Sequence, residues 1–202
     1  MPAFNTRVVR AGASLVRVHD PAFAPATFNP CRGRPTRFAP LQYSSSECLP
    51  SLYAASNFEC AVFETLFHDL DVTDPDKFIP LQDVTTRAVS ELTISADLKV
   101  ATLHEPDLNL LKITRAELID THSSEYEMTA RWAEAFHRAD PELAGLQWTS
   151  KRCDPAQAFV FFEDRVPEGT FAVVDSKVIG ASLAHFQEIQ GFARRAGITI
   201  TR

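Results

Sequence analysis

Alternating apolar and polar residues predict strands in several parts of the chain. Residues 15–19 alternate apolar and basic side chains, which places Arg17 on one face of a strand. Residues 158–163 are almost all apolar and predict a strand covered on both sides. Further strands are expected at 51–55, 87–94, 98–103, 146–150 and 170–174, with 87–94 and 98–103 adjacent in the sheet.

Apolar residues at helical spacing predict helices that begin near residues 57, 114, 124 and 183. Ser56 with Glu59, and Ser124 with Glu127, have the spacing of capping boxes, so these pairs are expected to start two of the helices. The residues expected to face the core in the two longest helices are Met128, Trp132, Ala135, Phe136, Ala139, Leu183, Phe186, Ile189 and Ala193.

Residues 21–40 contain several Pro and three Arg, and are expected to form an ordered loop between the first strands. Loops that carry Arg and aromatic residues are common places for ligand contacts. The chain has neither an internal repeat nor a low-complexity linker. A single α+β domain over residues 1–202, with central β-sheets and flanking helices, is therefore expected.

One carboxylate interrupts the apolar side of the helix expected after residue 57. At about 100° per residue, Glu64 falls on the same side as Cys60, Phe63 and Phe67. A carboxylate among apolar neighbours must be paired, reach water or take part in chemistry. One interpretation is that Glu64 lies at the rim and simply reaches water. The nearby Tyr53 and the basic segment before it favour a functional role.

Composition provides ample material for a core, since 45% of the 202 residues are hydrophobic and 15 are Phe. Apolar runs are too short to span a bilayer and the first residues lack a signal-peptide layout, so a cytoplasmic protein without membrane contact is expected. The four cysteines lack CxxC spacing, which predicts reduced thiols and no metal site. They are Cys31, Cys48, Cys60 and Cys153.

Charge is distributed unevenly along the chain. The net charge is −6, yet six Arg and a single acid, Asp20, occur up to Arg37. A net-negative protein is a poor general binder of nucleic acid. A local cluster of Arg is suited to a small molecule that carries phosphate. An equally open interpretation is a solvated basic face that pairs with the acidic remainder.

Common catalytic motifs are missing from the sequence. It contains no GxSxG, no Walker loop, no GxGxxG and no HExxH. The polar residues that remain as candidates stand near the starts and ends of the expected elements. They are Arg37, Tyr53, Glu64 and Ser150.

The order of four segments resembles that of the RES-domain toxins, which are named for their Arg, Glu and Ser. The segments are RFAP with Arg37, SLYAAS with Tyr53, AVFETLFH with Glu64, and QWTSKR with Ser150 before AFVFFE. The resemblance covers residues 15–163 and leaves 164–202 as a C-terminal strand and helix extension. The chain departs from the family where Thr36 replaces a Gly, and in the long segment after Arg37, which includes Tyr43.

The resemblance implies a fold similar to the diphtheria-toxin-like ADP-ribosyltransferases, with NAD+ as substrate and no metal. Cleavage of the nicotinamide–ribose bond develops positive charge on the ribose, which a fixed carboxylate at Glu64 would stabilise. Tyr53 would stack on nicotinamide. Arg37 and Arg17 would hold the pyrophosphate. Ser150 would bind the ribose or amide and orient the carboxylate, and Tyr126 would also line the cofactor site.

The resemblance further implies the toxin of a bacterial type II toxin–antitoxin system, restrained by a cognate Xre-type antitoxin. ADP-ribose would pass to a specific protein, as in a mono-ADP-ribosyltransferase, or to water or phosphate, as in an NAD+ glycohydrolase or phosphorylase. Two alternatives remain open. One is a nucleotide- or peptide-binding module without chemistry. The other is an RNase-type toxin that uses Glu64, His68 and Arg37 as base and acids, which the negative net charge disfavours.

Overall fold

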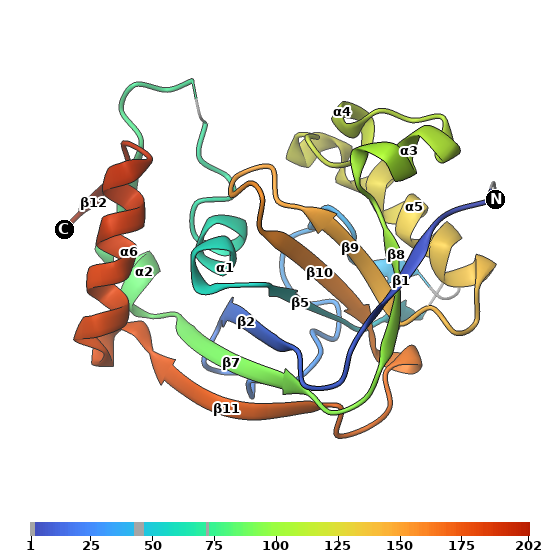
Figure 1. Ribbon diagram of the computed structural model, residues 1–202. Helices are drawn as coiled ribbons and strands as arrows, with labels where there is room; N and C mark the ends of the chain where they lie inside the picture. The colour runs from blue at the N-terminus through green and yellow to red at the C-terminus, as the bar shows by residue number, and fades with distance from the viewer. Residues whose placement is uncertain (1–2, 43–46, 72) are drawn as a thin grey trace.

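The computed structural model describes residues 3–42, 47–71 and 73–202, and places eight strands in one curled sheet (Figure 1). The strand order is β1-β8-β9-β10-β5-β2-β7-β11, and the β8–β9 pair is parallel whereas the other neighbours are antiparallel. The strands are β1 (Thr6–Val9), β2 (Ser14–His19), β5 (Ser51–Ala55), β7 (Ala88–Ile94), β8 (Leu98–Thr102), β9 (Gly145–Thr149), β10 (Gln157–Phe162) and β11 (Phe171–Val178).

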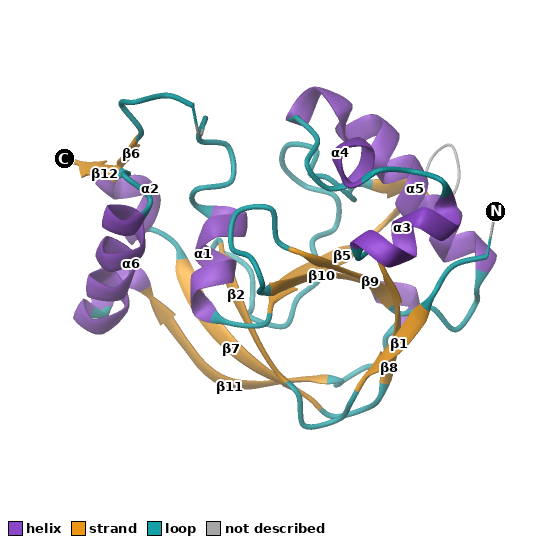
Figure 2. Ribbon diagram, turned by 45° about the horizontal axis from the view of Figure 1, so that its top comes forward, coloured by secondary structure: helices purple, strands orange, loops and turns teal. Residues whose placement is uncertain are grey.

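Helices flank this sheet, which confirms the expected α+β class. Figure 2 shows α1 inside the curl of the sheet, with α6 on one side of it and α3, α4 and α5 on the other. The α-helices are α1 (Phe58–Thr65), α2 (Leu81–Thr85), α3 (Glu105–Leu111), α4 (Arg115–Leu118), α5 (Tyr126–Ala139) and α6 (Leu183–Arg195). Two small sheets pair β3 (Leu41–Gln42) with β4 (Cys48–Leu49), and β6 (Phe78–Pro80) with β12 (Thr199–Thr201).

The consecutive strands β7 and β8 are not neighbours in the sheet, because each pairs with a different N-terminal strand on either side of a bend. β7 lies between β2 and β11, whereas β8 lies between β1 and β9, so the predicted adjacency of these two strands is wrong. β2 pairs with β7 and β1 pairs with β8, and the two connections meet at the bend. There the Asp97 carboxylate accepts hydrogen bonds from the Ala11 amide at 2.9 Å and the Arg10 side chain at 2.6 Å. The sheet therefore curls at this point.

The two faces of the sheet carry separate hydrophobic clusters. The larger cluster includes Val16, Val62 and Trp148, and lies on the face that α1 covers. The smaller one includes Leu15 and Phe161 on the opposite face. Because successive strand residues point to opposite faces, the position of each residue along β2 and β5 decides which cluster it joins.

Both predicted capping boxes are wrong, although the helices form. The α1 N-cap is Asn57, whose side chain accepts a hydrogen bond from the Cys60 amide, while the Ser56 hydroxyl accepts one from Gln157 of β10. α5 begins at Tyr126, directly after a short 3₁₀ turn over Ser123–Glu125, so Ser124 lies within that turn and is not the N-cap of the helix. Asn57 thus takes the capping role at α1, whereas α5 has no side-chain capping bond at its N-cap residue, Glu125.

The buried faces of α5 and α6 also differ from prediction. Met128 is 46% exposed and Leu183 is 71% exposed. The side chains buried along α5 are Tyr126, Thr129, Ala130, Ala133, Phe136 and His137. Polar residues belong to this face because each is hydrogen-bonded, which a pattern of apolar residues alone does not reveal.

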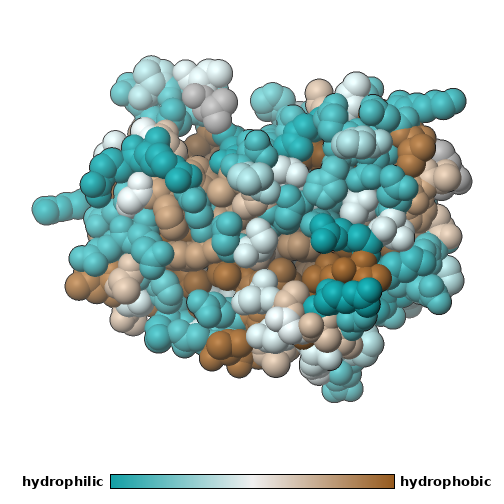
Figure 3. Space-filling model, viewed as in Figure 1, coloured by the Kyte–Doolittle hydropathy of each residue, from teal (hydrophilic) through white to brown (hydrophobic). Residues whose placement is uncertain are grey.

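The edge strand β11 leaves apolar side chains on the surface. Val173 is 48% exposed and Val174 is 63% exposed, but Asp175 and Lys177 follow them on the same strand. Charged residues on an edge strand disfavour pairing with other chains. Figure 3 shows hydrophilic side chains over much of one face of the molecule, with hydrophobic ones across its middle and along its lower edge.

Cys31 and Cys48 form a disulfide, with 6.3 Å between their Cα atoms. The expectation of four reduced thiols is therefore wrong for this pair, whereas Cys60 and Cys153 are free and buried. The sequence separation of 17 has no recognisable motif, so only the fold brings the two together. The bond closes a loop that contains Arg37. Tyr43, from the unusually long part of this loop, lies outside the described residues.

Reduction of this disulfide is expected to lower the free energy of unfolding by about 3 kcal/mol, because the unfolded chain regains the entropy of an open loop of this size. Urea denaturation with and without a phosphine reductant measures the difference. A variant with both Cys31→Ser and Cys48→Ser serves as control, since its stability should not respond to reductant. An unchanged midpoint for the wild type, despite two newly titratable thiols, would contradict the prediction.

Candidate active site

Glu64 lies in the last turn of α1, and its side chain is only 13% exposed. One carboxylate oxygen accepts a hydrogen bond of 2.6 Å from the Ser150 hydroxyl. The other oxygen is 3.7 Å from Nη1 of Arg37. The interpretation in which Glu64 merely reaches water is therefore wrong: the carboxylate is mostly buried and held by two partners.

The Ser150 hydroxyl has a fixed direction. Ser150 is fully buried in the turn between β9 and β10, and its oxygen accepts hydrogen bonds from the backbone amides of Arg152 at 3.1 Å and Cys153 at 3.0 Å. A hydroxyl has one hydrogen and two acceptor positions. With both acceptor positions used, the hydrogen must point to Glu64.

Arg37 is almost completely buried, at 2% exposure. Its carbonyl accepts a hydrogen bond from the Thr129 hydroxyl of α5. Its guanidinium carbon lies 5.9 Å from the centre of the Tyr126 ring, within the range of a cation–π contact. Nε and Nη2 are buried and have no hydrogen-bond partner among the described residues. The Arg37 side chain therefore retains donors that no residue described by the structure satisfies.

Tyr53 of β5 lies on the same face of the sheet as α1 and holds the segment around Arg37. Its hydroxyl accepts hydrogen bonds from the Phe38 amide at 2.9 Å and the Thr36 hydroxyl at 3.0 Å. Its ring packs edge-on to Trp148, with 6.2 Å between centres. Burial raises the pKa of Tyr53 to about 12, so the hydroxyl stays neutral. Thr36, which departs from the family pattern, thus has a direct contact at the site.

Tyr126 joins the group through His68, one turn beyond Glu64. The Tyr126 hydroxyl is 2.8 Å from Nε2 of His68, and Nδ1 of His68 is 2.8 Å from the Asp69 carboxylate. Burial raises the pKa of the Tyr126 hydroxyl, and the charge of Arg37 opposes that shift. Because residues four apart lie on the same side of a helix, the sequence could have indicated that His68 lies near Glu64.

Arg17 is not brought to this group. It alternates with Val16 and Val18 along β2 and therefore points to the opposite face of the sheet from α1. Its guanidinium donates to the carbonyls of Pro25 at 2.9 Å and Thr27 at 3.0 Å. Burial lowers its pKa to about 10. The expectation that Arg17 shares a ligand with Arg37 finds no support in its position.

The sequence did not predict a role for Lys151 and Arg152, the two cations that follow Ser150. Lys151 donates to the Thr121 carbonyl at 2.8 Å, and Arg152 donates to the carbonyls of His68 at 3.0 Å and Leu70 at 2.8 Å. Burial lowers the pKa of Lys151, and the charges of Arg37 and Arg152 lower it further. Lys151, Arg37 and Arg152 therefore lie close enough to affect one another electrostatically, with Glu64 as the buried carboxylate among them. An excess of positive charge of this kind favours an anionic ligand.

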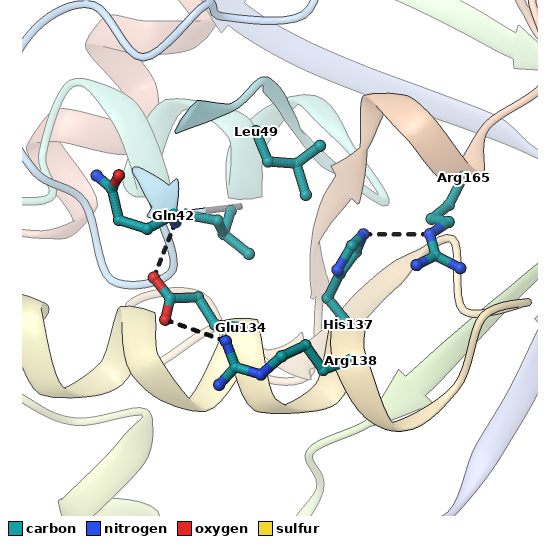
Figure 4. A pocket seen from close by; sticks show the side chains of 7 residues that line it. Gln42, Leu49, Glu134, His137, Arg138 and Arg165 are labelled. Atoms are coloured by element: carbon teal, nitrogen blue, oxygen red, sulfur yellow. Dashed lines mark hydrogen bonds and ion pairs between the residues drawn. The ribbon is translucent and has the colours of Figure 1, made fainter. Parts of the chain in front are cut away.

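A separate pocket of about 250 Å³ lies along the second half of α5 (Figure 4). Its polar groups bond to one another: the Gln42 amide donates to Glu134 at 2.8 Å, and Nε of Arg165 lies 3.1 Å from Nε2 of His137. The lining residues are Leu41, Gln42, Leu49, Glu134, His137, Arg138 and Arg165. Since none of the residues around Glu64 lines it, this pocket is distinct from the candidate active site.

No group of three or more His, Cys, Asp or Glu residues in the described parts of the chain is placed to hold a metal ion. No helix there is both long and apolar enough to cross a bilayer.

The protein is an α+β domain in which a mostly buried carboxylate, Glu64, is paired with a buried arginine, Arg37, inside the curl of the sheet. The sequence model of the RES domain matches residues 14–182. The chain therefore belongs to the RES-domain family, which confirms the resemblance of its four segments. The match also includes β11, so it extends beyond residues 15–163, the range over which the four segments resemble the family.

A solved structure shares this fold. The chain is similar to one in the crystal structure of the M. tuberculosis MbcT-MbcA toxin-antitoxin complex, with a TM-score of 0.61 and 13% sequence identity. The similarity covers 91% of this chain and 92% of that one. No curated protein is similar enough in sequence to match the chain.

Proposed function

We propose that this protein is the toxin of a type II toxin–antitoxin module and consumes NAD+ by cleaving its nicotinamide–ribose bond. The observation that carries the proposal is the Glu64 carboxylate, which is mostly buried and held between the Ser150 hydroxyl and the Arg37 guanidinium. Membership of the RES-domain family supports the same reaction class.

In the proposed reaction, the bond between ribose C1′ and the nicotinamide nitrogen breaks, and nicotinamide departs with the electron pair. The ribose is left with oxocarbenium character, and a new bond forms from C1′ to an acceptor oxygen or nitrogen that loses its proton. Glu64 stabilises the positive ribose. Since Ser150 and Arg37 already fix the carboxylate, it need not reorganise when the charge develops.

The neighbouring residues shape the site around that charge. Tyr53 offers an aromatic face for nicotinamide, and Tyr126 lines the same region through its contacts with His68 and Arg37. Arg37 is almost completely buried, so its role in this arrangement is to hold the Glu64 carboxylate and not to bind a phosphate. Lys151 is the more accessible cation for an anionic part of the substrate.

The acceptor of ADP-ribose decides between two enzyme types. Incubation with labelled NAD+ and cell lysate separates them, because a mono-ADP-ribosyltransferase labels a specific protein whereas a glycohydrolase or phosphorylase releases ADP-ribose or its phosphate. Nicotinamide release by the purified protein tests the shared step. Tight binding of NAD+ without release would instead identify a binding module.

A toxin of this kind requires a restraint, and we propose a cognate antitoxin of the Xre type as the partner. The related fold was solved in a toxin-antitoxin complex, which supports a partner protein for this chain as well. Growth arrest on expression of the chain alone, relieved by co-expression of the neighbouring gene, is the expected result.

Ser150→Ala is expected to lower kcat for nicotinamide release about 10- to 100-fold, because a hydrogen bond to a charged group contributes about 1.5–3 kcal/mol. The variant removes the only hydrogen that points from Ser150 to Glu64. Initial rates at saturating NAD+ measure the effect. Ser95→Ala, at an exposed turn between β7 and β8, is the matched control and should keep the wild-type rate. Equal rates for the two variants would contradict the role of Ser150.

A further inference from the structure

We infer that Arg152 is a positioning residue that fixes the turn directly after α1 to the turn that carries Ser150, and thereby sets the geometry of Glu64. Its side chain binds the turn after α1, and its backbone amide binds the turn between β9 and β10. Nη2 donates to the carbonyls of His68 and Leu70, and the amide nitrogen donates to the Ser150 hydroxyl. The inference rests on the proposed function for its kinetic consequences only.

The segment that Arg152 binds is the turn that follows α1. The helix has no basic residue in its last turn, and the chain continues through a turn whose carbonyls have to be satisfied. Arg152 satisfies two of these carbonyls, those of His68 and Leu70, from a position 84 and 82 residues further along the chain, respectively.

The same residue acts on the acceptor side of the Ser150 hydroxyl. If the turn moved away from α1, the 2.6 Å hydrogen bond from Ser150 to Glu64 would lengthen at once. Two other side chains hold the turn from the opposite side: Lys151 donates to Thr121, and Arg115 donates to the Thr149 carbonyl at 3.0 Å. Among these three anchors, Arg152 is the one whose contacts lie on the α1 side.

Arginine suits this position better than lysine. Its planar guanidinium can hold two carbonyls at once in a fixed orientation, whereas an ammonium group on a flexible stem fixes its partners less well. Nε of Arg152 is buried without a partner among the described residues, and Nη2 makes both hydrogen bonds of the link. Arg152→Lys should therefore restore only part of what Arg152→Met removes.

The test compares nicotinamide release by Arg152→Met with that of the wild type. Loss of the link is expected to lower kcat about 10- to 100-fold, since a small misplacement of a catalytic group has effects of this size. KM should change by less than about threefold, because Arg152 binds backbone and not substrate in this arrangement. Arg10→Met, at an exposed ion pair with Asp97, is the matched control.

A double-mutant cycle distinguishes positioning from a general structural role. If Arg152 acts through Ser150, the variant with both Ser150→Ala and Arg152→Met should lose little more than Ser150→Ala alone. Fully additive losses in kcat would overturn the inference. So would a wild-type kcat for Arg152→Met.

Hydrogen exchange gives a readout that does not need activity. Arg152→Met should exchange faster than the wild type in peptides that cover residues 66–70 and 150–153, and Arg152→Lys should lie between them. Unchanged exchange in both peptides would overturn the inference. If the wild type releases no nicotinamide, the proposed function fails while the exchange data still decide the role of Arg152.

Discussion

Glu64→Gln is expected to reduce nicotinamide release at least about a hundredfold, which corresponds to a loss of about 3 kcal/mol in transition-state stabilisation. The amide can still accept the hydrogen bond from Ser150, but it carries no charge to oppose the developing cation on the ribose. Because size and one hydrogen bond are kept, the fold should persist. Turnover at saturating NAD+, together with the circular dichroism spectrum, measures both expectations.

The matched control for this substitution is Glu59→Gln, one turn earlier on the same helix. Glu59 forms an ion pair with Arg195 of α6 and has no contact with Ser150 or Arg37. Its variant should turn over NAD+ at the wild-type rate. If Glu64→Gln were as active as Glu59→Gln, the carboxylate would have no part in the reaction and the proposed function would have to be abandoned.

The sequence predicted the elements well where apolar residues alone decide them. β10 is almost wholly apolar, and it was correctly expected to be covered on both sides. Glu64 could be singled out because a carboxylate among Cys60, Phe63 and Phe67 breaks the apolar side of α1. Such local patterns are visible in one dimension because they depend on residues three or four apart.

What the sequence did not predict depends on contacts between distant residues. Strand alternation separates Arg17 from the site, but only the pairing of β2 with β5 shows which face belongs to α1. The Cys31–Cys48 bond and the contacts of Arg152 likewise join segments that no local pattern connects. In α5, Tyr126 is buried because His68 satisfies its hydroxyl, and that partner is 58 residues away.

Tyr53→Ala is expected to have the second large effect, on stability and on substrate binding together. Removal of a partly buried aromatic ring that packs on Trp148 should lower the free energy of unfolding by about 3 kcal/mol or more. It also removes the acceptor for the Phe38 amide and the Thr36 hydroxyl, the two groups that flank Arg37. KM for NAD+ should rise and kcat should fall, since nicotinamide loses its aromatic platform.

Two further variants separate these effects. Tyr53→Phe keeps the ring and leaves the Phe38 amide without its acceptor, so stability should fall by about 1–3 kcal/mol while KM stays near the wild-type value. Phe28→Ala removes a ring that packs on Phe171 at the opposite face of the sheet, and should lower stability without changing KM. The ring of Tyr53 can be a nicotinamide platform only if KM rises in Tyr53→Ala alone. An equal KM in all three folded variants would limit Tyr53 to holding the Arg37 segment.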